Sequence, residues 1–515
     1  MVFINLDQDL LIPLSHPITM KKLPYISGLC SLMIIFCIGA SCKKPDDNFK
    51  EPVEQRTDTL TVAQLRDFSS LPLPSRIYIT NARQKGYYNL DQGDRKTADN
   101  LGVTLVTAHG IRYKRDYSGP ANALWFDVLP SDDDIGPELQ NAVNGADDVF
   151  IPDGSYRQRT TVRLRSNMKL QANPGKVLIT LPATYVSLAN AIDPKIDLKN
   201  VVIDGLSWNV TTRENGVFGT IYIDSPNVAN LTIQNCTSKD YDSKDSTNWL
   251  TLKIPAGKSA ENIVVKNNVV RARRMGCEIF NHDNYNKYVG KNIEVSNNTF
   301  YDCHFGISLS GPMENITVEN NTVKNCSLYG IEIAGALRNV KVNSNKFEGK
   351  FDKFFIGSND GNGNGSVTGG MIVTSNETVG RCTGGIAIYN GGAFTVSKNK
   401  FNMTGMIEIS HSSNGGTFSE NTVESLSSKV IICDNTSNNR FMNNVISNRN
   451  ASSNQAVFMA YGNKSLNHVL TANRFTKGPG GKYMEGADGG TYRASDNQDE
   501  SGKPVHEQPI KSTRI

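Results

Sequence analysis

Apolar and polar residues alternate in short runs along this chain, and turns that contain asparagine separate the runs. Residues 292–300 and 315–323 share one pattern, and a run that begins Gly-Ile follows each of them, at Gly306 and Gly330. Alternation with a period of two predicts β-strands that bury one face. From about residue 200 onward we therefore expect a succession of short strands.

The asparagine turns recur at intervals of 22 to 33 residues. The turn residues that align are Asn235, Asn268, Asn298, Asn321, Asn345, Asn399, Asn421, Asn444 and Asn473, with Glu377 in one register. A repeat of this length with three strands predicts one coil of a right-handed parallel β-helix, because a single coil cannot bury its apolar face and a stack can. A β-sandwich has turns every ~8–12 residues, so the longer period argues against it.

Two flanking segments differ from the repeats. Residues 61–127 are rich in strand-forming and aromatic residues and predict a small β-rich module. An acidic turn followed by apolar positions at Ile135, Leu139 and Val143 predicts a short helix. We expect an all-β fold with about 10–12 coils over residues 128–480, and a tail over residues 481–515.

The predicted helix, the segment Val-Phe-Ile-Pro-Asp-Gly-Ser-Tyr at residues 149–156 and the repeats together resemble the pectate-lyase-like superfamily. The resemblance covers about residues 76–475. It implies a parallel β-helix whose first coil is capped by the helix, and a polysaccharide bound across the sheet of the Gly-Ile strands. The catalytic motifs of polygalacturonases and of the main pectate lyases are not found in the sequence, so the resemblance leaves the reaction open.

The amino terminus has the pattern of an export signal. Lys21 and Lys22 precede an apolar stretch at residues 29–38, and Gly-Ala-Ser-Cys follows, ending at Cys42. This resembles a bacterial lipobox and the surface lipoproteins of Bacteroidetes-type bacteria. We expect residues 1–41 to be an upstream extension and signal peptide, Cys42 to be lipidated, and residues 42–60 to be a tether. The protein would then be on the outer membrane or cell surface, in contact with the membrane through the lipid anchor only.

Composition excludes several other classes. Lysine and arginine number 54 and aspartate and glutamate 50, so the net charge is +4. No basic stripe with interleaved aromatics is present, which argues against nucleic-acid binding. Six cysteines lie beyond residue 200 without metal-ligand spacing, and we expect them to be reduced core residues of a monomer.

Side chains that point outward from the Gly-Ile strands should form columns, because neighbouring strands are about 4.8 Å apart. The first predicted column is Tyr222, Thr251, Glu278, Ser308, Glu332, Phe355, Ala387 and Glu408. The second is Asp224, Lys253, Phe280, Ser310, Ala334, Gly357, Tyr389 and Ser410. Long insertions and three of the seven histidines flank the middle of this sheet, which makes it the candidate site.

From these columns and their flanking loops we select the candidate residues. The candidate catalytic residues are Lys253, Arg274, Glu278, His282, His304 and Glu332. The candidate substrate-binding residues are Tyr222, Arg273, Phe280, Tyr389 and Glu408.

Two enzymatic reactions fit these residues. The preferred one is β-elimination on a uronate-containing polysaccharide, in which a basic side chain removes the C5 proton and a cation neutralises the carboxylate. The alternative is inverting hydrolysis, with Glu278 and Glu332 two coils apart, at about 9.6 Å. C5 epimerisation uses the same residue types, and carboxylates here suit Ca²⁺. We favour an enzyme over the remaining alternative, a glycan-binding surface lipoprotein.

Overall fold

The computed structural model describes residues 53–69, 71–182, 186–189, 196–211, 219–240, 247–272, 274–281, 289–359 and 370–505. The predicted signal peptide and Cys42 lie outside the described residues, so the lipoprotein interpretation stays a prediction. Among the described segments, no helix is long and apolar enough to cross a membrane.

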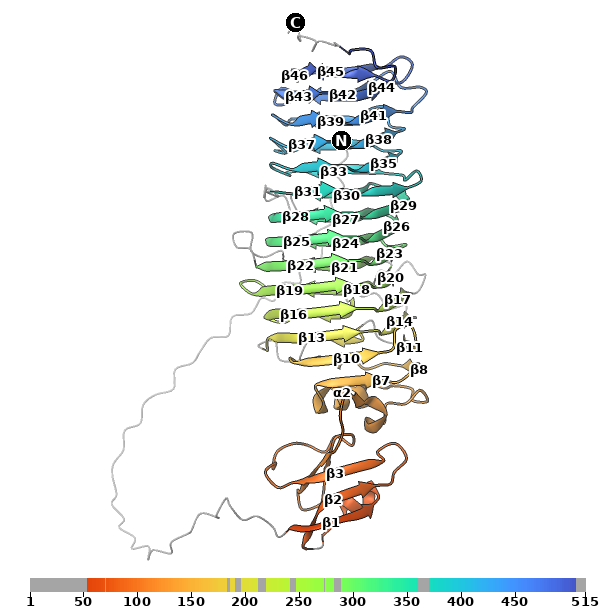
Figure 1. Cartoon of the computed structure of the whole chain (residues 1–515), viewed down its shortest axis with the longest axis vertical. Helices are drawn as coiled ribbons and strands as arrows, with labels where there is room; N and C mark the ends of the chain where they lie inside the picture. Colours follow the sequence, from red (N-terminus) through yellow and green to blue (C-terminus); the bar gives the residue numbers. More distant parts are fainter. Residues whose placement is uncertain are drawn as a thin grey trace, which may run out of the picture. The chain divides into compact units, whose positions relative to one another are not determined.

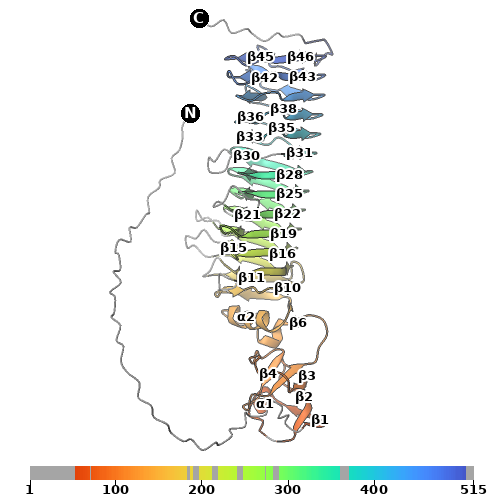
Figure 2. The same ribbon diagram turned by 90° about the vertical axis from the view of Figure 1, so that its left-hand side faces the viewer.

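From residue 121 the chain winds into three long parallel sheets that run side by side (Figures 1 and 2). The first sheet has 15 strands: β6 (Ala121–Asn122), β7 (Asp148–Ile151), β10 (Met168–Ala172), β13 (Leu198–Asp204), β16 (Asn227–Gln234), β19 (Ser259–Lys266), β22 (Gly290–Ser296), β25 (Met313–Glu319), β28 (Leu337–Asn343), β31 (Ile372–Thr374), β34 (Thr395–Ser397), β37 (Thr417–Ser419), β40 (Arg440–Met442), β43 (His468–Thr471) and β46 (Tyr492–Ser495). The second sheet has 14: β8 (Gly154–Arg157), β11 (Val177–Leu181), β14 (Ser207–Val210), β17 (Thr237–Asp240), β20 (Val269–Arg271), β23 (Thr299–Tyr301), β26 (Thr322–Cys326), β29 (Lys346–Phe351), β32 (Glu377–Val379), β35 (Lys400–Met403), β38 (Thr422–Ser425), β41 (Val445–Asn448), β44 (Arg474–Thr476) and β47 (Gln498–Asp499). The third sheet has 13: β9 (Val162–Arg163), β12 (Leu188–Ala189), β15 (Gly219–Ile223), β18 (Asn248–Lys253), β21 (Met275–Phe280), β24 (Phe305–Ser310), β27 (Tyr329–Ala334), β30 (Phe354–Asn359), β33 (Gly385–Tyr389), β36 (Ile407–Ser410), β39 (Ile431–Asp434), β42 (Ala456–Tyr461) and β45 (Lys482–Ala487).

The predicted fold class, an all-β right-handed parallel β-helix, is confirmed. The third sheet has 13 described strands, one from each coil, so the coils outnumber the 10–12 that we expected. The last coil was assigned to the tail, but β45, β46 and β47 pair with β42, β43 and β44.

Buried asparagines form a continuous ladder at one corner of the coils. Each side chain bonds the next asparagine and a backbone carbonyl, as Asn321 does with Asn345 Oδ1 at 3.0 Å and Val295 O at 2.8 Å. The ladder is Asn268, Asn298, Asn321, Asn345, Asn376, Asn399, Asn421, Asn444, Asn473 and Asn497. The bonds satisfy backbone groups that bend away from the sheets.

Two positions in our alignment of this ladder were wrong. Cys236, not Asn235, occupies the ladder position, and its N–H donates to Asn268 Oδ1. Asn376 occupies it in place of Glu377. Each turn pairs a residue of left-handed backbone with the ladder residue that follows it, and Asn235 is the left-handed one, with φ 55°. An asparagine in the sequence does not show which of the two positions it fills.

A second asparagine ladder was not predicted. Asn167, Asn200, Asn230, Asn262, Asn292, Asn315 and Asn339 bond one another in chain order on the surface. All seven have φ between 53° and 58°. Asparagine adopts such left-handed conformations more readily than other non-glycine residues, which explains its presence at this turn.

Glycine at the start of the Gly-Ile strands is required by the close approach of the next coil. A Cβ atom on Gly306 would lie 2.6 Å from the carbonyl oxygen of Gly330, and one on Gly330 would lie 2.6 Å from that of Phe355. The chain bends tightly from the second sheet into the third at this position. The bend therefore determines which of the following residues point outward from the third sheet.

The described chain begins with a five-stranded module. Its strands are β1 (Val53–Leu60), β2 (Leu73–Ile79), β3 (Gly86–Asp91), β4 (Thr104–Val106) and β5 (Arg112–Arg115), in the order β1-β2-β3-β5-β4, with helix α1 (Val62–Arg66). The tether was expected to extend to residue 60, but β1 pairs with β2 from Val53. The polar sequence of β1 suits an edge strand.

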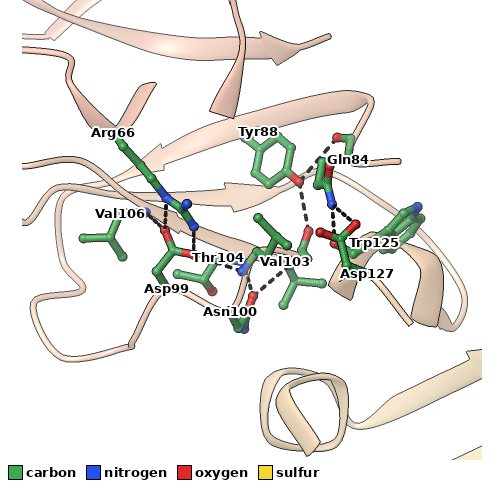
Figure 3. A network of polar contacts seen from close by, with 12 residues as sticks. Arg66, Gln84, Tyr88, Asp99, Asn100, Val103, Thr104, Val106, Trp125 and Asp127 are labelled. Atoms are coloured by element: carbon green, nitrogen blue, oxygen red, sulfur yellow. Dashed lines mark hydrogen bonds and ion pairs between the residues drawn. The ribbon is translucent and has the colours of Figure 1, made fainter. Parts of the chain in front are cut away.

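Hydrogen bonds connect this module to the start of the β-helix (Figure 3). Gln84 Nε2 donates to Trp125 O at 3.2 Å and to Asp127 Oδ1 at 3.0 Å. The Arg115 guanidinium lies over the Trp125 ring. Trp125 belongs to the short helix η1 (Ala123–Phe126). The predicted helix is α2 (Gly136–Gly145), and its side chains Leu139, Ala142 and Val143 join the β-helix core.

Candidate functional site

Carboxyl side chains gather on the outer face of the third sheet, between β18 and β36. The outward column observed there is Tyr222, Thr251, Glu278, Ser308, Glu332, Gly357, Ala387 and Glu408. It agrees with the predicted column except at one position. Gly357 replaces Phe355, whose side chain is fully buried.

Glu278 is partly buried and held through one of its two oxygens. Its Oε2 accepts from Asn248 Nδ2 at 2.7 Å and from Thr251 Oγ1 at 3.2 Å. Within the described residues, Oε1 accepts no hydrogen bond. Burial raises the pKa of the Glu278 carboxyl, whereas Arg274 and the Thr251 bond act in the opposite direction and Glu332 raises it further.

Glu332 lies two strands further along the same column and is held through both oxygens. Ser308 Oγ donates to Oε2 at 2.7 Å, and Asn359 Nδ2 donates to Oε1 at 3.1 Å. Burial raises the pKa of this carboxyl, while the two hydrogen bonds and the charge of Lys353 lower it. The two glutamates therefore share a face and a direction of pKa shift but differ in their bonding.

Aromatic rings form a column next to the carboxylates. Phe305 and Tyr329 are stacked with centroids 5.4 Å apart, and Tyr329 and Phe354 lie 5.9 Å apart. These rings precede the Gly-Ile motif, where we predicted no outward column. Aligning the residue directly before the glycine position, which is Met275, Phe305, Tyr329 and Phe354 in successive coils, would have found it.

Tyr329 and Tyr389 extend the polar part of the site toward Glu408. Gly357 makes room for the Tyr329 ring, since a Cβ atom there would lie 2.5 Å from Tyr329 Cε1. Burial, Glu332 and Glu408 raise the pKa of Tyr329 to about 12. Burial and a hydrogen bond with Glu408 raise the pKa of Tyr389. Both phenols are therefore neutral donors at physiological pH.

Basic residues line the corner where the coils enter the third sheet. The N–H of His304 donates to Arg274 O at 2.9 Å, and two coils further Lys353 continues the same corner. His304 Nδ1 lies 2.7 Å from Ser327 Oγ. Burial, Arg274 and Lys353 lower the pKa of His304, so the imidazole is neutral near pH 7. Within the described residues, no ion pair joins Arg274 or Lys353 to a carboxylate.

Three other predicted residues lie at the edge of this site. Lys253 Nζ forms an ion pair with Asp224 Oδ2 at 3.3 Å, so it is less suited to act as a free base. Tyr222 is partly buried and its hydroxyl lies 3.4 Å from the same Asp224 oxygen. Phe280 is partly buried in the second outward column, paired with Lys253 and Ser310.

Arg273 and His282 lie outside the described residues, so their places in the site stay predictions. Among the described residues, no group of three or more histidine, cysteine, aspartate or glutamate side chains could hold a metal ion. The six cysteines beyond residue 200 are buried and free. A hollow of about 370 Å³ lies on the second sheet, lined by residues such as Trp208 and Tyr301, away from the carboxylates.

Comparison with known proteins agrees with the geometry of the coils. A family model described as a right handed beta helix region matches residues 200–367. The predicted resemblance is therefore confirmed at the level of the β-helix.

Solved structures similar to this chain include a tailspike protein of Acinetobacter baumannii phage AM24, at 16% identity and a TM-score of 0.43, covering 75% of this chain and 65% of that one. The surface protein and adhesin PfbA of Streptococcus pneumoniae has 13% identity and a TM-score of 0.46, and the match covers 72% of this chain and 100% of that one. The A-module of a mannuronan C-5 epimerase of Azotobacter vinelandii has 15% identity and a TM-score of 0.44, and the match covers 76% of this chain and 95% of that one. The β-helix fold by itself does not define an activity.

Proposed function

We propose that this protein is a polysaccharide-cleaving enzyme that acts on an acidic glycan at the outer face of the third sheet, by inverting hydrolysis. The observation that carries the proposal is the pair Glu278 and Glu332. Both carboxyls point from one column, both are partly buried, and burial raises the pKa of each. Carboxyls whose pKa values are raised by burial are typical of acid–base catalysis.

The separation of the pair supports inversion over retention. Two strand steps place the two residues about 9.6 Å apart along the column. Inverting enzymes hold their carboxyls about 6.5–9.5 Å apart to admit a water molecule, and retaining enzymes hold them at about 5–5.5 Å. This spacing is close to the upper end of the inverting range and well beyond the retaining one.

The hydrogen bonds support different roles for the two glutamates. Glu278 keeps Oε1 free of hydrogen bonds within the described residues, so a proton there can be given to the leaving oxygen. Glu332 accepts a hydrogen bond on each oxygen, which favours its ionised form. We therefore assign Glu278 as the general acid and Glu332 as the base that activates water.

The cations at the corner support an acidic substrate. Arg274 and Lys353 flank the two glutamates and have no ion pair within the described residues, so they can bind a carboxylate of the glycan. The aromatic column of Phe305, Tyr329 and Phe354 adds apolar surface between them and the carboxyl pair. Sugar rings contact such surfaces through their C–H groups while their hydroxyls reach Tyr389 and Glu408.

A second candidate reaction is β-elimination, favoured by the neutral imidazole of His304. Burial and the neighbouring cations keep its pKa low, so it can accept a proton. Arg274 would then neutralise the uronate carboxylate and make the C5 proton more acidic. In this reaction Glu278 would have a smaller role than in hydrolysis.

Product analysis separates these reactions. Polygalacturonate, alginate, hyaluronan and chondroitin are incubated with the protein, and the products are examined for unsaturated ends and for the anomeric configuration of new reducing ends. Hydrolysis with inversion is the expected result. Unsaturated ends would instead indicate β-elimination, and binding without cleavage would indicate a glycan-binding protein.

A further inference from the structure

Asn248, at the start of β18, holds Glu278 in a fixed arrangement. It is fully buried, and its Nδ2 group donates one hydrogen to Glu278 Oε2 at 2.7 Å and the other to Thr251 Oγ1 at 2.8 Å. Thr251 Oγ1 lies 3.2 Å from the same Glu278 oxygen. The three side chains therefore form a closed triangle of hydrogen bonds.

The backbone determines which way the Asn248 amide points. The N–H of Met275 lies 3.2 Å from Asn248 Oδ1. A backbone N–H can only donate, so the atom that faces it must be the carbonyl oxygen. The amide nitrogen must then face Thr251 and Glu278. Neither amide hydrogen is left over, and the amide cannot flip without leaving Met275 unsatisfied.

The donors in this triangle determine where Glu278 can carry a proton. The Thr251 hydroxyl accepts a hydrogen from Asn248, so its own hydrogen is free to be donated to Glu278 Oε2. Oε2 then receives two hydrogens, and a proton on Oε2 would require the Thr251 hydroxyl to reverse and give up the bond that it donates. A proton on Oε1, the oxygen that has no hydrogen bond within the described residues, leaves both bonds intact and is therefore favoured.

We propose that Asn248 and Thr251 are positioning residues that favour Oε1 over Oε2 as the site of the acidic proton of Glu278. This deepens the proposed function and rests on it for the catalytic meaning, but the location of the proton is a property of the protein alone. The same logic does not apply to Glu332, because each of its two oxygens accepts one hydrogen bond and neither is left open for a proton.

These hydrogen bonds predict the direction in which the pKa of Glu278 changes when a donor is removed. Donors to Oε2 stabilise the ionised carboxylate, so their removal must raise the pKa of Glu278. Thr251→Val removes one donor and keeps the shape of the side chain. Thr251→Ser keeps the hydroxyl and serves as the conservative rescue. Ser308→Ala is the matched control, because it removes a donor to Glu332 instead.

The test is an NMR titration of protein labelled with ¹³C at the glutamate side-chain carboxyl carbon, with Glu278 and Glu332 assigned from their Gln variants. Thr251→Val and Asn248→Ala should move the midpoint of Glu278 to higher pH and leave that of Glu332 nearly unchanged. Ser308→Ala should do the reverse, and Thr251→Ser should restore the wild-type midpoint. If Asn248→Ala does not fold, the threonine variants carry the test.

An unchanged Glu278 midpoint in folded Thr251→Val would overturn the proposal. A second measurement uses a glycan from the panel above that the wild-type protein cleaves. The alkaline limb of the Thr251→Val pH–rate profile, which reports the general acid, should shift in the same direction as the midpoint, with a loss of about tenfold or more in kcat from misplacement of the acid. If the midpoint moves but no glycan is cleaved, the proposed function fails while the positioning role stands.

Discussion

The side chains of Glu278 and Glu332 are more buried than those of ordinary surface glutamates. Burial raises the pKa of both carboxyls, and neither forms an ion pair with a cation within the described residues. Desolvation of a charge costs stability unless the charge is compensated. Residues whose burial costs stability are characteristic of functional sites.

This cost predicts how the stability of a variant depends on pH. Because the folded-state pKa of Glu278 lies above that of the unfolded chain, the folded protein binds more protons, and its stability falls as pH rises between the two values. Glu278→Gln keeps the oxygen that Asn248 and Thr251 bind but has no charge. Its free energy of unfolding should exceed that of the wild type by about 0.5–2 kcal/mol at pH 8, and the difference should shrink toward pH 4.

Thermal unfolding of the two proteins across this pH range checks the prediction. Glu485→Gln is the control, because Glu485 lies in the same outward column but is paired with Lys482 at 2.7 Å. A Glu278→Gln protein that is less stable than the wild type at every pH would show that the carboxylate is stabilising and its burial compensated.

At the scale of the element, the coil is defined by its turns. Asn321 makes four side-chain hydrogen bonds: it donates to Val295 and Asn345, and it accepts the backbone N–H and the side-chain amide of Asn298. Asn321→Leu removes all four and leaves buried backbone groups without partners. Since each such group costs about 1–3 kcal/mol, we expect a loss of about 3 kcal/mol or more in the free energy of unfolding.

The exposed ladder provides the matched comparison for this variant. Asn315 donates to Asn292 at 3.2 Å and accepts from Asn339 at 3.1 Å on the surface, with φ 58°. Asn315→Gly loses both exposed bonds but relieves the left-handed backbone, so its effect should be within about 1 kcal/mol. Chemical denaturation of both variants measures the difference. Equal losses would mean that burial is not what makes the inner ladder important.

How far the sequence predicts these elements depends on which contacts set them. The period of the turns and the alternation at Ile307 and Ile331 were sufficient for the fold and for most of the outward column. The predicted outward column was wrong at Phe355, because that residue takes the buried corner position that Gly306 and Gly330 occupy in other coils. No local pattern shows such an exchange.

Side-chain partners were the part of the site that the sequence did not reveal. Asn248 is 30 residues from Glu278 in the chain, yet it donates to its carboxylate. Asn359 donates to Glu332 from 27 residues away. Both contacts depend on coil lengths that vary along the chain. The aromatic column was missed because its rings precede the motif on which the repeats were aligned.

At the scale of the whole molecule, we propose that the β-helix is held at a membrane surface by a lipid on Cys42. The pattern Gly-Ala-Ser-Cys after an apolar stretch motivates the proposal. Cys42→Ala should move the protein from the membrane fraction to the soluble fraction, because a polar tether alone has no affinity for lipid. Cell fractionation with metabolic labelling by a fatty acid checks this. An unlabelled wild-type protein, or a variant that stays with the membrane, would show that Cys42 is not the anchor.

The central claim is that the outer face of the third sheet cuts a polysaccharide with Glu278 and Glu332. The most direct test compares turnover of the best glycan of the panel by the wild type, Glu278→Gln, Glu332→Gln and the control Glu485→Gln. We expect each of the first two variants to lose about 10² to 10⁴ in turnover, the range for an acid–base group, and the control to match the wild type. Wild-type turnover by Glu278→Gln, or binding of the glycan with no cleavage by any of the four proteins, would contradict the claim.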